Sequence, residues 1–465
     1  MRLTIDKIAL YFVVFFFVAL TFLAKDIPFF WDEVYYIGTA FNIYDSDFYA
    51  IIPPLEHDRG NFPFYGFYMA LWWKIFGKTL AVGHFAILPV LLGVAWEYFS
   101  LAKKFISAKW IPLAMLLLVL EPTFSTQSIL MGHDVFLLYF FLGSVRAVFY
   151  ERKILFLIFF SILALHNIKG FPAVFAVGLF YFIAQKKINL KDFIILALPA
   201  VLWLVWMFFH HSKTGWYLFT PVNDYGNSPV SFFVFLKRIL LSLWQLADFG
   251  RVFLLLVIFG CFVLFVRKII SRDAKQFFYL YLISTAVFIL FFSAVDVGLC
   301  HRYFMPLFLL ANILVCICLA NFSVQKIFSS AVSVLLCMCL LAGNFWLYGG
   351  GLSNGWDSSL KILQYFGLKD EMDAFVKEKK INSEETGTKF PLYHDRKNTH
   401  LEDESFHYTD MKKDSLEKYN YVLLSNVSNQ FTVDERKKLN SDWVLVKEFS
   451  GGQVYLKLFK NPKTE

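Results

Sequence analysis

Long, nearly uncharged apolar runs recur throughout residues 1–350. Most runs are about as long as a helix that crosses a bilayer, given a rise of roughly 1.5 Å per residue and a hydrocarbon core of about 30 Å, and those at 154–168 and 171–184 are shorter. Only 17% of the residues are charged, fewer than the ~25% that is typical of soluble domains. The sequence therefore predicts a polytopic α-helical membrane protein with about 11 transmembrane helices. The runs lie near residues 8–24, 81–102, 111–127, 134–150, 154–168, 171–184, 193–210, 250–266, 277–294, 302–320 and 327–346.

Two parts of different character follow from this pattern. Residues 1–350 are expected to form the membrane domain, with long outer loops at residues 25–80 and 211–249. Residues 351–465 are expected to form a small soluble α/β domain. There, LKDEMDAFVKEKK is typical of an amphipathic helix, YNYVLLS of a buried strand and DERKKLN of a short helix. The stretches WVLVKEF and QVYLKLF, separated by Ser-Gly-Gly, predict a hairpin.

The distribution of charge predicts the orientation. Residues 1–350 carry 26 Lys and Arg against 17 Asp and Glu, whereas residues 351–465 carry 18 against 19. The basic residues of the membrane part gather in alternate connecting segments, which the positive-inside rule assigns to the cytoplasm. We therefore expect a cytoplasmic N-terminus, an outer soluble domain and no nucleic-acid partner. These basic residues include Lys103, Lys104, Lys109, Arg152, Lys153, Lys186, Lys187, Lys191, Arg267 and Lys268.

Ionisable residues also gather at the predicted outer ends of the helices. They are Asp32 and Glu33 after the first run, His133 and Asp134 before the fourth, Lys169 between the fifth and sixth, and His301 and Arg302 before the tenth. Charges at the edge of a membrane are costly and are kept mostly where they are paired or used. Two acidic and two cationic sites on one side would suit transfer from an anionic lipid phosphate.

Each of these residues also has a structural interpretation. Acidic residues such as Asp32, Glu33 and Asp134 stabilise a helix N-terminus, but they could equally act as catalytic carboxylates. Lys169 could reach the interface along its own apolar stem, and an arginine could anchor a helix end. As functional residues, Lys169, Arg302 and His301 would bind the phosphate of a donor.

A divalent metal ion is a further prediction. Oxygen and imidazole ligands close together suit such an ion, and Glu56 and His57 in the first outer loop, with His133, are the candidates. A solvated cluster of charges is the alternative interpretation of the loop residues. Glu121, inside the third run, has no assigned role.

Several short motifs together resemble a known family. They are Asp32-Glu33 with Tyr36, Pro63 with FYGFYMALWWKIFG, Pro122 followed by His133-Asp134, Lys169-Gly170, Thr214-Gly215, and Arg302-Tyr303 with Pro306. In this order the chain resembles the C-type membrane glycosyltransferases that use polyprenyl-phosphate sugars. These include the bacterial aminoarabinose transferases of lipid A and the protein O-mannosyltransferases.

The resemblance implies an inverting transfer. Asp32 would deprotonate the acceptor, Lys169 and Arg302 would bind the lipid phosphate, and Asp134 would orient the acceptor or a metal ion. Aminoarabinose transferases place a Glu-Lys pair directly before the first-loop proline, whereas Asn61-Phe62 precedes Pro63 here.

The expected function is therefore transfer of a hexose or pentose from a polyprenyl-phosphate donor to a glycolipid, polysaccharide or protein at the outer face. The resemblance favours a bacterial inner membrane. Two alternatives remain: a transporter or flippase of lipid-linked sugars, and a non-catalytic membrane scaffold. The sequence shows no internal repeat, a feature that many transporters have.

Overall fold

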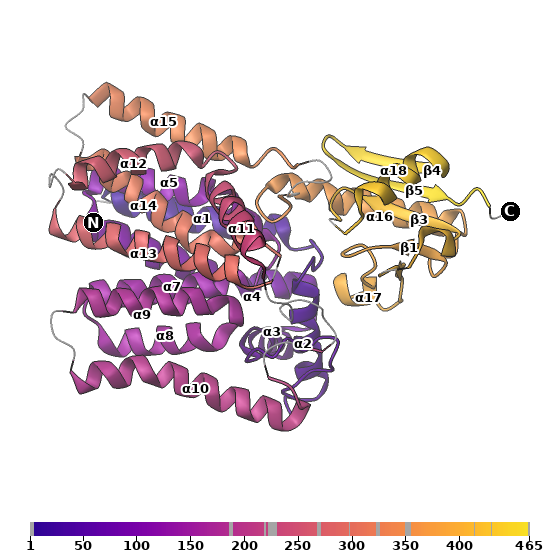
Figure 1. Cartoon of the computed structure of the whole chain (residues 1–465), viewed down its shortest axis with the longest axis horizontal. Helices are drawn as coiled ribbons and strands as arrows, with labels where there is room; N and C mark the ends of the chain where they lie inside the picture. Colours follow the sequence, from indigo (N-terminus) through magenta and orange to yellow (C-terminus); the bar gives the residue numbers. More distant parts are fainter. Residues whose placement is uncertain are drawn as a thin grey trace.

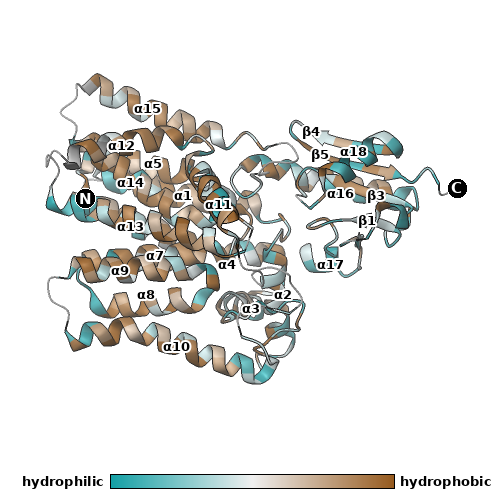
Figure 2. Ribbon diagram, in the orientation of Figure 1, coloured by the Kyte–Doolittle hydropathy of each residue, from teal (hydrophilic) through white to brown (hydrophobic). Residues whose placement is uncertain are grey.

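The computed structural model describes residues 4–185, 189–217, 220–221, 230–266, 271–296, 298–321, 326–348, 355–412, 414–428 and 430–463. A bundle of long helices forms one part of the molecule, and a small sheet domain lies at one end of it (Figure 1). The N-terminus lies at the opposite end of the bundle. Apolar residues dominate the bundle, and polar residues dominate the sheet domain (Figure 2).

Every predicted run coincides with a helix or a bent pair of helices. They are α1 Ile5–Ala24, α4 Leu80–Phe105, α5 Ile111–Leu120 with α6 Pro122–Ile129, α7 Asp134–Phe149, α8 Lys153–His166, α9 Phe171–Ala184, α10 Leu190–Thr214, α12 Val252–Val266, α13 Arg272–Ala294, α14 Met305–Asn321 and α15 Lys326–Gly343. Among the described residues, 5 helices are long and apolar enough to span a membrane, or up to 7 if each bent pair is one span. Shorter apolar helices complete the bundle, which is that of a polytopic membrane protein.

The pair α5 and α6 is bent by 56° at Glu121 and Pro122. A residue before proline is pushed towards extended backbone, and Glu121 has ψ 113°. The Glu121 carboxylate then accepts a hydrogen bond from the Phe124 N–H at 2.6 Å and caps α6. The break therefore has a local cause in the sequence.

The two long outer segments contain helices that do not belong to the runs. The first holds α2 (Glu33–Asp45) and α3 (Phe64–Phe76), which pack against each other. The second was expected to be a loop over residues 211–249, but it contains α11 (Phe232–Ala247). α11 is amphipathic: apolar residues gather on one side of it, and Lys237 and Arg238 interrupt the apolar sequence. This pattern is typical of a helix at a surface. Residues 218–219 and 222–229 of that segment lie outside the described part.

The sheet domain contains α16 (Leu363–Glu378), α17 (Arg396–Thr399), α18 (Val433–Asp442) and five strands. The strands are β1 (Thr386–Thr388), β2 (Thr409–Asp410), β3 (Tyr421–Ser425), β4 (Val444–Gly451) and β5 (Val454–Lys460), in the order β2-β1-β3-β5-β4. The predicted hairpin is β4-β5, and Gly452 in its turn has φ 63°.

The domain is docked on the bundle by an aromatic cluster. Phe30 and Trp31, between α1 and α2, pack with Trp356, Tyr365 and Phe390. The Phe29 N–H also donates to the Thr399 carbonyl at 2.9 Å. This contact places the sheet domain directly beside the first turn of α2.

Candidate active site

The first turn of α2 presents two neighbouring carboxylates. Asp32 is the N-cap residue, and Glu33 is the first residue of the helix. The helix dipole favours negative charge at this end. The Asp32 side chain is 28% exposed, whereas the Glu33 side chain is fully buried. Trp31, just before them, has φ 60°, a conformation that non-glycine residues rarely adopt.

Arg302 lies against these carboxylates from a distant part of the chain. It belongs to the turn η3 (His301–Phe304) that precedes α14, and its side chain is only 1% exposed. One terminal nitrogen lies 2.5 Å from Asp32 Oδ2, and the other lies 3.5 Å from Glu33 Oε1. Arg302 Nε lies 3.5 Å from Asp134 Oδ2. The guanidinium therefore faces three carboxylates.

Lys169 approaches the same place from the turn η2 (Ile168–Gly170) between α8 and α9. Its Nζ lies 3.4 Å from Asp32 Oδ2 and 3.9 Å from Asp134 Oδ2. The Tyr303 ring lies 4.6 Å from the ammonium group. Lys169 and Arg302 thus share Asp32 between them.

His133 and Asp134 enter at the start of α7, and both side chains are buried. His133 Nδ1 lies 3.4 Å from Glu33 Oε1. The Tyr36 ring stacks on the His133 imidazole with 3.7 Å between centroids. Six predicted residues from α2, α7, η2 and η3 therefore meet in one cluster, which we call the acid–base cluster: Asp32, Glu33, His133, Asp134, Lys169 and Arg302.

The two carboxylates of α2 have opposite electrostatic environments. Burial alone would raise the pKa of Asp32, but Arg302, Lys169 and Arg59 outweigh it and lower this pKa to about 2. Burial dominates at Glu33 and raises its pKa to about 8, which Arg302 only partly offsets. At neutral pH, Asp32 is ionised and Glu33 is protonated. The turn therefore offers an anion beside a neutral acid.

His301 does not point to this cluster, although the sequence predicted that it would bind phosphate. Its Nε2 lies 2.9 Å from Asp248 Oδ2, and its Nδ1 lies 3.5 Å from Asp357 Oδ1. Consecutive residues of a tight turn direct their side chains to different sides. His301 is therefore engaged by two carboxylates while Arg302 reaches Asp32.

The three candidate metal ligands are not grouped. Glu56 is 75% exposed and lies 3.6 Å from His57, whereas His133 lies in the acid–base cluster. The neighbouring Asp58 instead faces His210, with 2.9 Å between Oδ2 and Nε2. Within the described ranges, no three His, Cys, Asp or Glu side chains are placed to hold a metal ion. Glu56, His57 and His133 therefore do not fit a shared metal site.

A cavity lies directly beside the acid–base cluster. It is bounded by the first outer segment, by α10 and by the Tyr36 face of α2. Aromatic, basic and hydroxyl groups are mixed on its walls, as in sites for polar ligands with apolar parts. Its lining includes Tyr36, Thr39, His57, Asp58, Arg59, Phe62, Tyr65, His166, Trp206 and His210.

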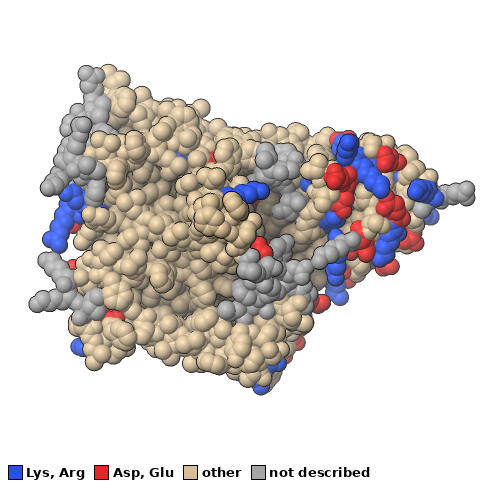
Figure 3. Space-filling view, viewed as in Figure 1, with Lys and Arg blue, Asp and Glu red and all other residues tan. Residues whose placement is uncertain are grey.

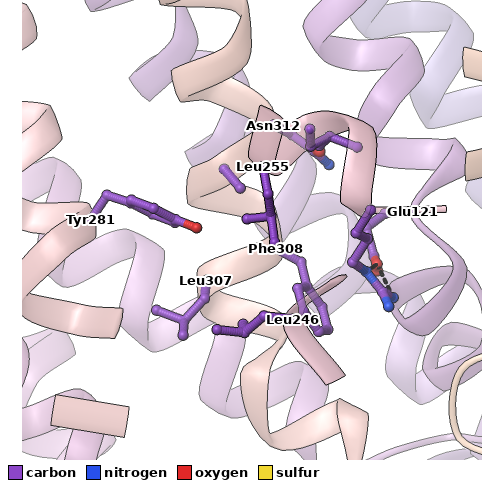
Figure 4. A pocket seen from close by; sticks show the side chains of 10 residues that line it. Glu121, Leu246, Leu255, Tyr281, Leu307, Phe308 and Asn312 are labelled. Carbon is purple, nitrogen blue, oxygen red and sulfur yellow. Dashed lines mark hydrogen bonds and ion pairs between the residues drawn. The ribbon is translucent and has the colours of Figure 1, made fainter. Parts of the chain in front are cut away.

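Glu121 has a partner in a second cavity, inside the bundle. Arg251, at the start of α12, forms an ion pair with Glu121 and lies over the Phe308 ring, 3.8 Å from its centroid. Asn312 and Tyr281 bring further polar groups among leucines (Figure 4). The ion pair joins the break between α5 and α6 to the break between α11 and α12.

Sequence reasoning missed two residues that touch Arg302. Trp356 lies over its guanidinium, and Asp357 accepts a hydrogen bond from its backbone N–H. Both belong to the Gly- and Ser-rich stretch GLSNGWDSS, which has the composition of a linker. Only the isolated Trp in that polar stretch could have signalled a role.

The chain was compared with known proteins. No family model matches it, and no curated protein matches it. Among solved structures, it is similar to ArnT from Cupriavidus metallidurans bound to undecaprenyl phosphate, with a TM-score of 0.52 and 12% identity. It is also similar to the apo form of that protein, with a TM-score of 0.53 and 14% identity. Each match covers 96% of this chain and 97% of the other.

Coverage of both chains over nearly their whole lengths includes the bundle and the sheet domain together. It confirms the fold that the motifs predicted. The chain therefore has an ArnT-like fold.

Proposed function

We propose that this protein transfers a sugar from a polyprenyl-phosphate donor to an acceptor hydroxyl, with inversion at the anomeric carbon. The observation that carries the proposal is the position of Asp32, a partly exposed carboxylate between Lys169 and Arg302. α2, whose first turn carries Asp32, lies at the end of the apolar bundle next to the sheet domain (Figure 2). A lipid chain could therefore run along the helices while its phosphate reaches these cations.

The donor phosphate would compete with Asp32 for the two cations. When Lys169 and Arg302 turn to the phosphate, Asp32 loses part of the field that holds its pKa at about 2. The pKa of Asp32 then rises, because burial is the opposing effect. Donor binding would thus convert a neutralised carboxylate into a better proton acceptor.

The transfer itself is a single displacement. The acceptor oxygen attacks the anomeric carbon, its proton passes to Asp32, and the bond between that carbon and the phosphate oxygen breaks. The electron pair of this bond leaves with the phosphate, whose charge Lys169 and Arg302 stabilise. Glu33, protonated at neutral pH, can donate a hydrogen bond, and Asp134 would help to orient Lys169 and the acceptor.

The lipid and the location belong to the same proposal. The similar ArnT structure is bound to undecaprenyl phosphate, which supports a polyprenyl carrier. Lys and Arg lie at the bundle end far from the sheet domain, and the band between the ends shows few charges (Figure 3). By the positive-inside rule, this favours an outer sheet domain. We place the protein in a bacterial inner membrane.

The test is transfer from radiolabelled polyprenyl-phosphate sugars by the purified protein, with host membrane extract as acceptor. Wild type should form labelled product, and Asp32→Asn should reduce the rate by about 100-fold or more, because proton acceptors contribute on the order of 10² to 10⁴. Asp45→Asn, at the other end of α2 and paired with Lys78, is the matched control and should retain the wild-type rate. Full activity of Asp32→Asn would exclude its role as the base.

A requirement for a divalent metal stays a prediction, and no step above depends on one. Dialysis of the purified protein against a chelator tests it. Loss of transfer that added metal restores would establish the requirement.

Transport of lipid-linked sugars is the second candidate. Two bent spans, at 56° and 93°, meet through the buried Glu121–Arg251 pair. Broken helices with polar groups at the break are typical of transporters. Movement of labelled donor across vesicles without chemical transfer would favour this function.

A further inference from the structure

Residues 355–359, which lead into the sheet domain and are called the leading segment here, lie against the acid–base cluster on the side of Arg302. Trp356 and Asp357 are 4% and 2% exposed, although the surrounding sequence resembles a linker. The Ser358 hydroxyl lies 2.7 Å from Thr123 Oγ1, and Gln127 Nε2 donates to the Asp357 carbonyl at 3.2 Å. Both contacts fix the leading segment to α6.

Asp357 holds the turn that carries Arg302. Its Oδ2 accepts the Arg302 N–H at 3.0 Å, and its Oδ1 lies 3.5 Å from His301 Nδ1. His301 is held on its other side by Asp248, at 2.9 Å. One carboxylate therefore fixes the backbone of Arg302 and the side chain before it. Because these residues are buried, water cannot easily take the place of Asp357, and its loss would leave the Arg302 N–H without an acceptor.

Trp356 links the two halves of the central ion pair. Its ring lies 5.0 Å from Arg302 Cζ, and it stacks on Trp31 with 4.0 Å between centroids and 26° between planes. Trp31 directly precedes Asp32 and has φ 60°. Trp356 therefore contacts both Arg302 and Trp31, the residue directly before Asp32.

We infer that Trp356 and Asp357 are positioning residues, which hold the Arg302 guanidinium beside Asp32, where it can bind a lipid phosphate. This inference rests on the proposed function and adds to it: the site is complete only when the leading segment is seated. Both residues are buried. They act on the substrate through Arg302. Substituting them should therefore change binding only when Arg302 is present.

The experiment measures binding of undecaprenyl phosphate to the full-length protein in lipid nanodiscs. Asp357→Ala should weaken binding on the order of ten-fold, because it leaves the buried Arg302 N–H without an acceptor. Asp357→Asn retains an oxygen acceptor and should lose less. Asp414→Asn is the control, since Asp414 lies in the sheet domain and pairs with Lys418.

Dependence on Arg302 separates positioning from general stability. In an Arg302→Ala background, which itself weakens binding, Asp357→Ala should cause little further loss, because the group that it positions is absent. Equal fold-losses in both backgrounds, or wild-type binding by Asp357→Ala, would overturn the inference. Absence of binding by the wild type would instead contradict the proposed function. Trp356→Phe keeps an aromatic ring against Trp31 and Arg302 and should retain most binding, whereas Trp356→Ala should not. Equal binding by both variants would refute the role of the stack.

Discussion

At the scale of single residues, the first turn of α2 separates two carboxylates by environment. Asp32 faces two cations and stays ionised, whereas Glu33 is buried and has a pKa raised to about 8. Neighbouring positions on one turn point in different directions, so adjacent acids can differ in this way. The pair can therefore supply a proton acceptor and a hydrogen-bond donor at the same pH.

Glu33 should make stability depend on pH. Its folded-state pKa lies above the ordinary value of 4.5, so between pH 4.5 and 8 the unfolded chain has lost a proton that the folded protein retains. Stability should fall as the pH rises through this window, by at most about 1.4 kcal/mol per pH unit. Thermal unfolding of wild type and Glu33→Gln from pH 5 to 8 measures this. The variant should gain on the wild type as the pH rises, and a constant difference would contradict the account.

Arg302 should not be replaceable by lysine. A lysine keeps the charge but loses the planar fork that faces Asp32, Glu33 and Asp134. Arg302→Lys should lower kcat/KM for the donor by about ten-fold or more, measured in the transfer assay. Arg146→Lys is the control. Arg146 lies near the C-terminal end of α7 and pairs with Glu97 of α4, and the substitution keeps a cation there. Equal activity of both variants would argue against bidentate binding.

At the scale of elements, two helix breaks share one ion pair. Glu121 lies where α5 gives way to α6, and Arg251 lies at the start of α12. Removing one partner of a buried pair leaves an uncompensated charge and typically costs 3–5 kcal/mol. Glu121→Gln should therefore lower the unfolding temperature strongly. Glu121→Gln combined with Arg251→Gln should recover much of that loss, and failure to recover would show that the charges are not coupled.

The sequence predicted elements better than the directions of side chains. The bilayer's thickness imposes a length on apolar runs, so each predicted run corresponds to a helix. α11 was missed because Lys237 and Arg238 interrupt its apolar sequence, so no long uncharged run marks it. The convergence of Asp32, Asp134 and Lys169 was predicted from sidedness alone. The direction of His301 and the return of Asp357 to Arg302 depend on tertiary packing, which no local pattern carries.

At the scale of the whole molecule, the helix bundle and the sheet domain follow one another along the long axis (Figure 1). The N-terminus and the sheet domain lie at opposite ends of the bundle, and α2, whose first turn carries Asp32 and Glu33, lies at the end next to the sheet domain (Figure 1). Under the proposed function, this arrangement would bring the donor from the lipid phase and the acceptor from the water phase. The aromatic cluster that docks the domain at Phe30 and Trp31 ties this architecture to Asp32.

The proposed reaction is a single displacement of a lipid phosphate from the sugar, with Asp32 as the base. The most direct measurement is the anomeric configuration of the sugar in the product, compared with that in the donor by NMR. A single displacement gives the inverted configuration and releases one polyprenyl phosphate for each sugar transferred, and Asp32→Asn should form little of either product. A retained configuration would require a covalent intermediate and would exclude a single displacement.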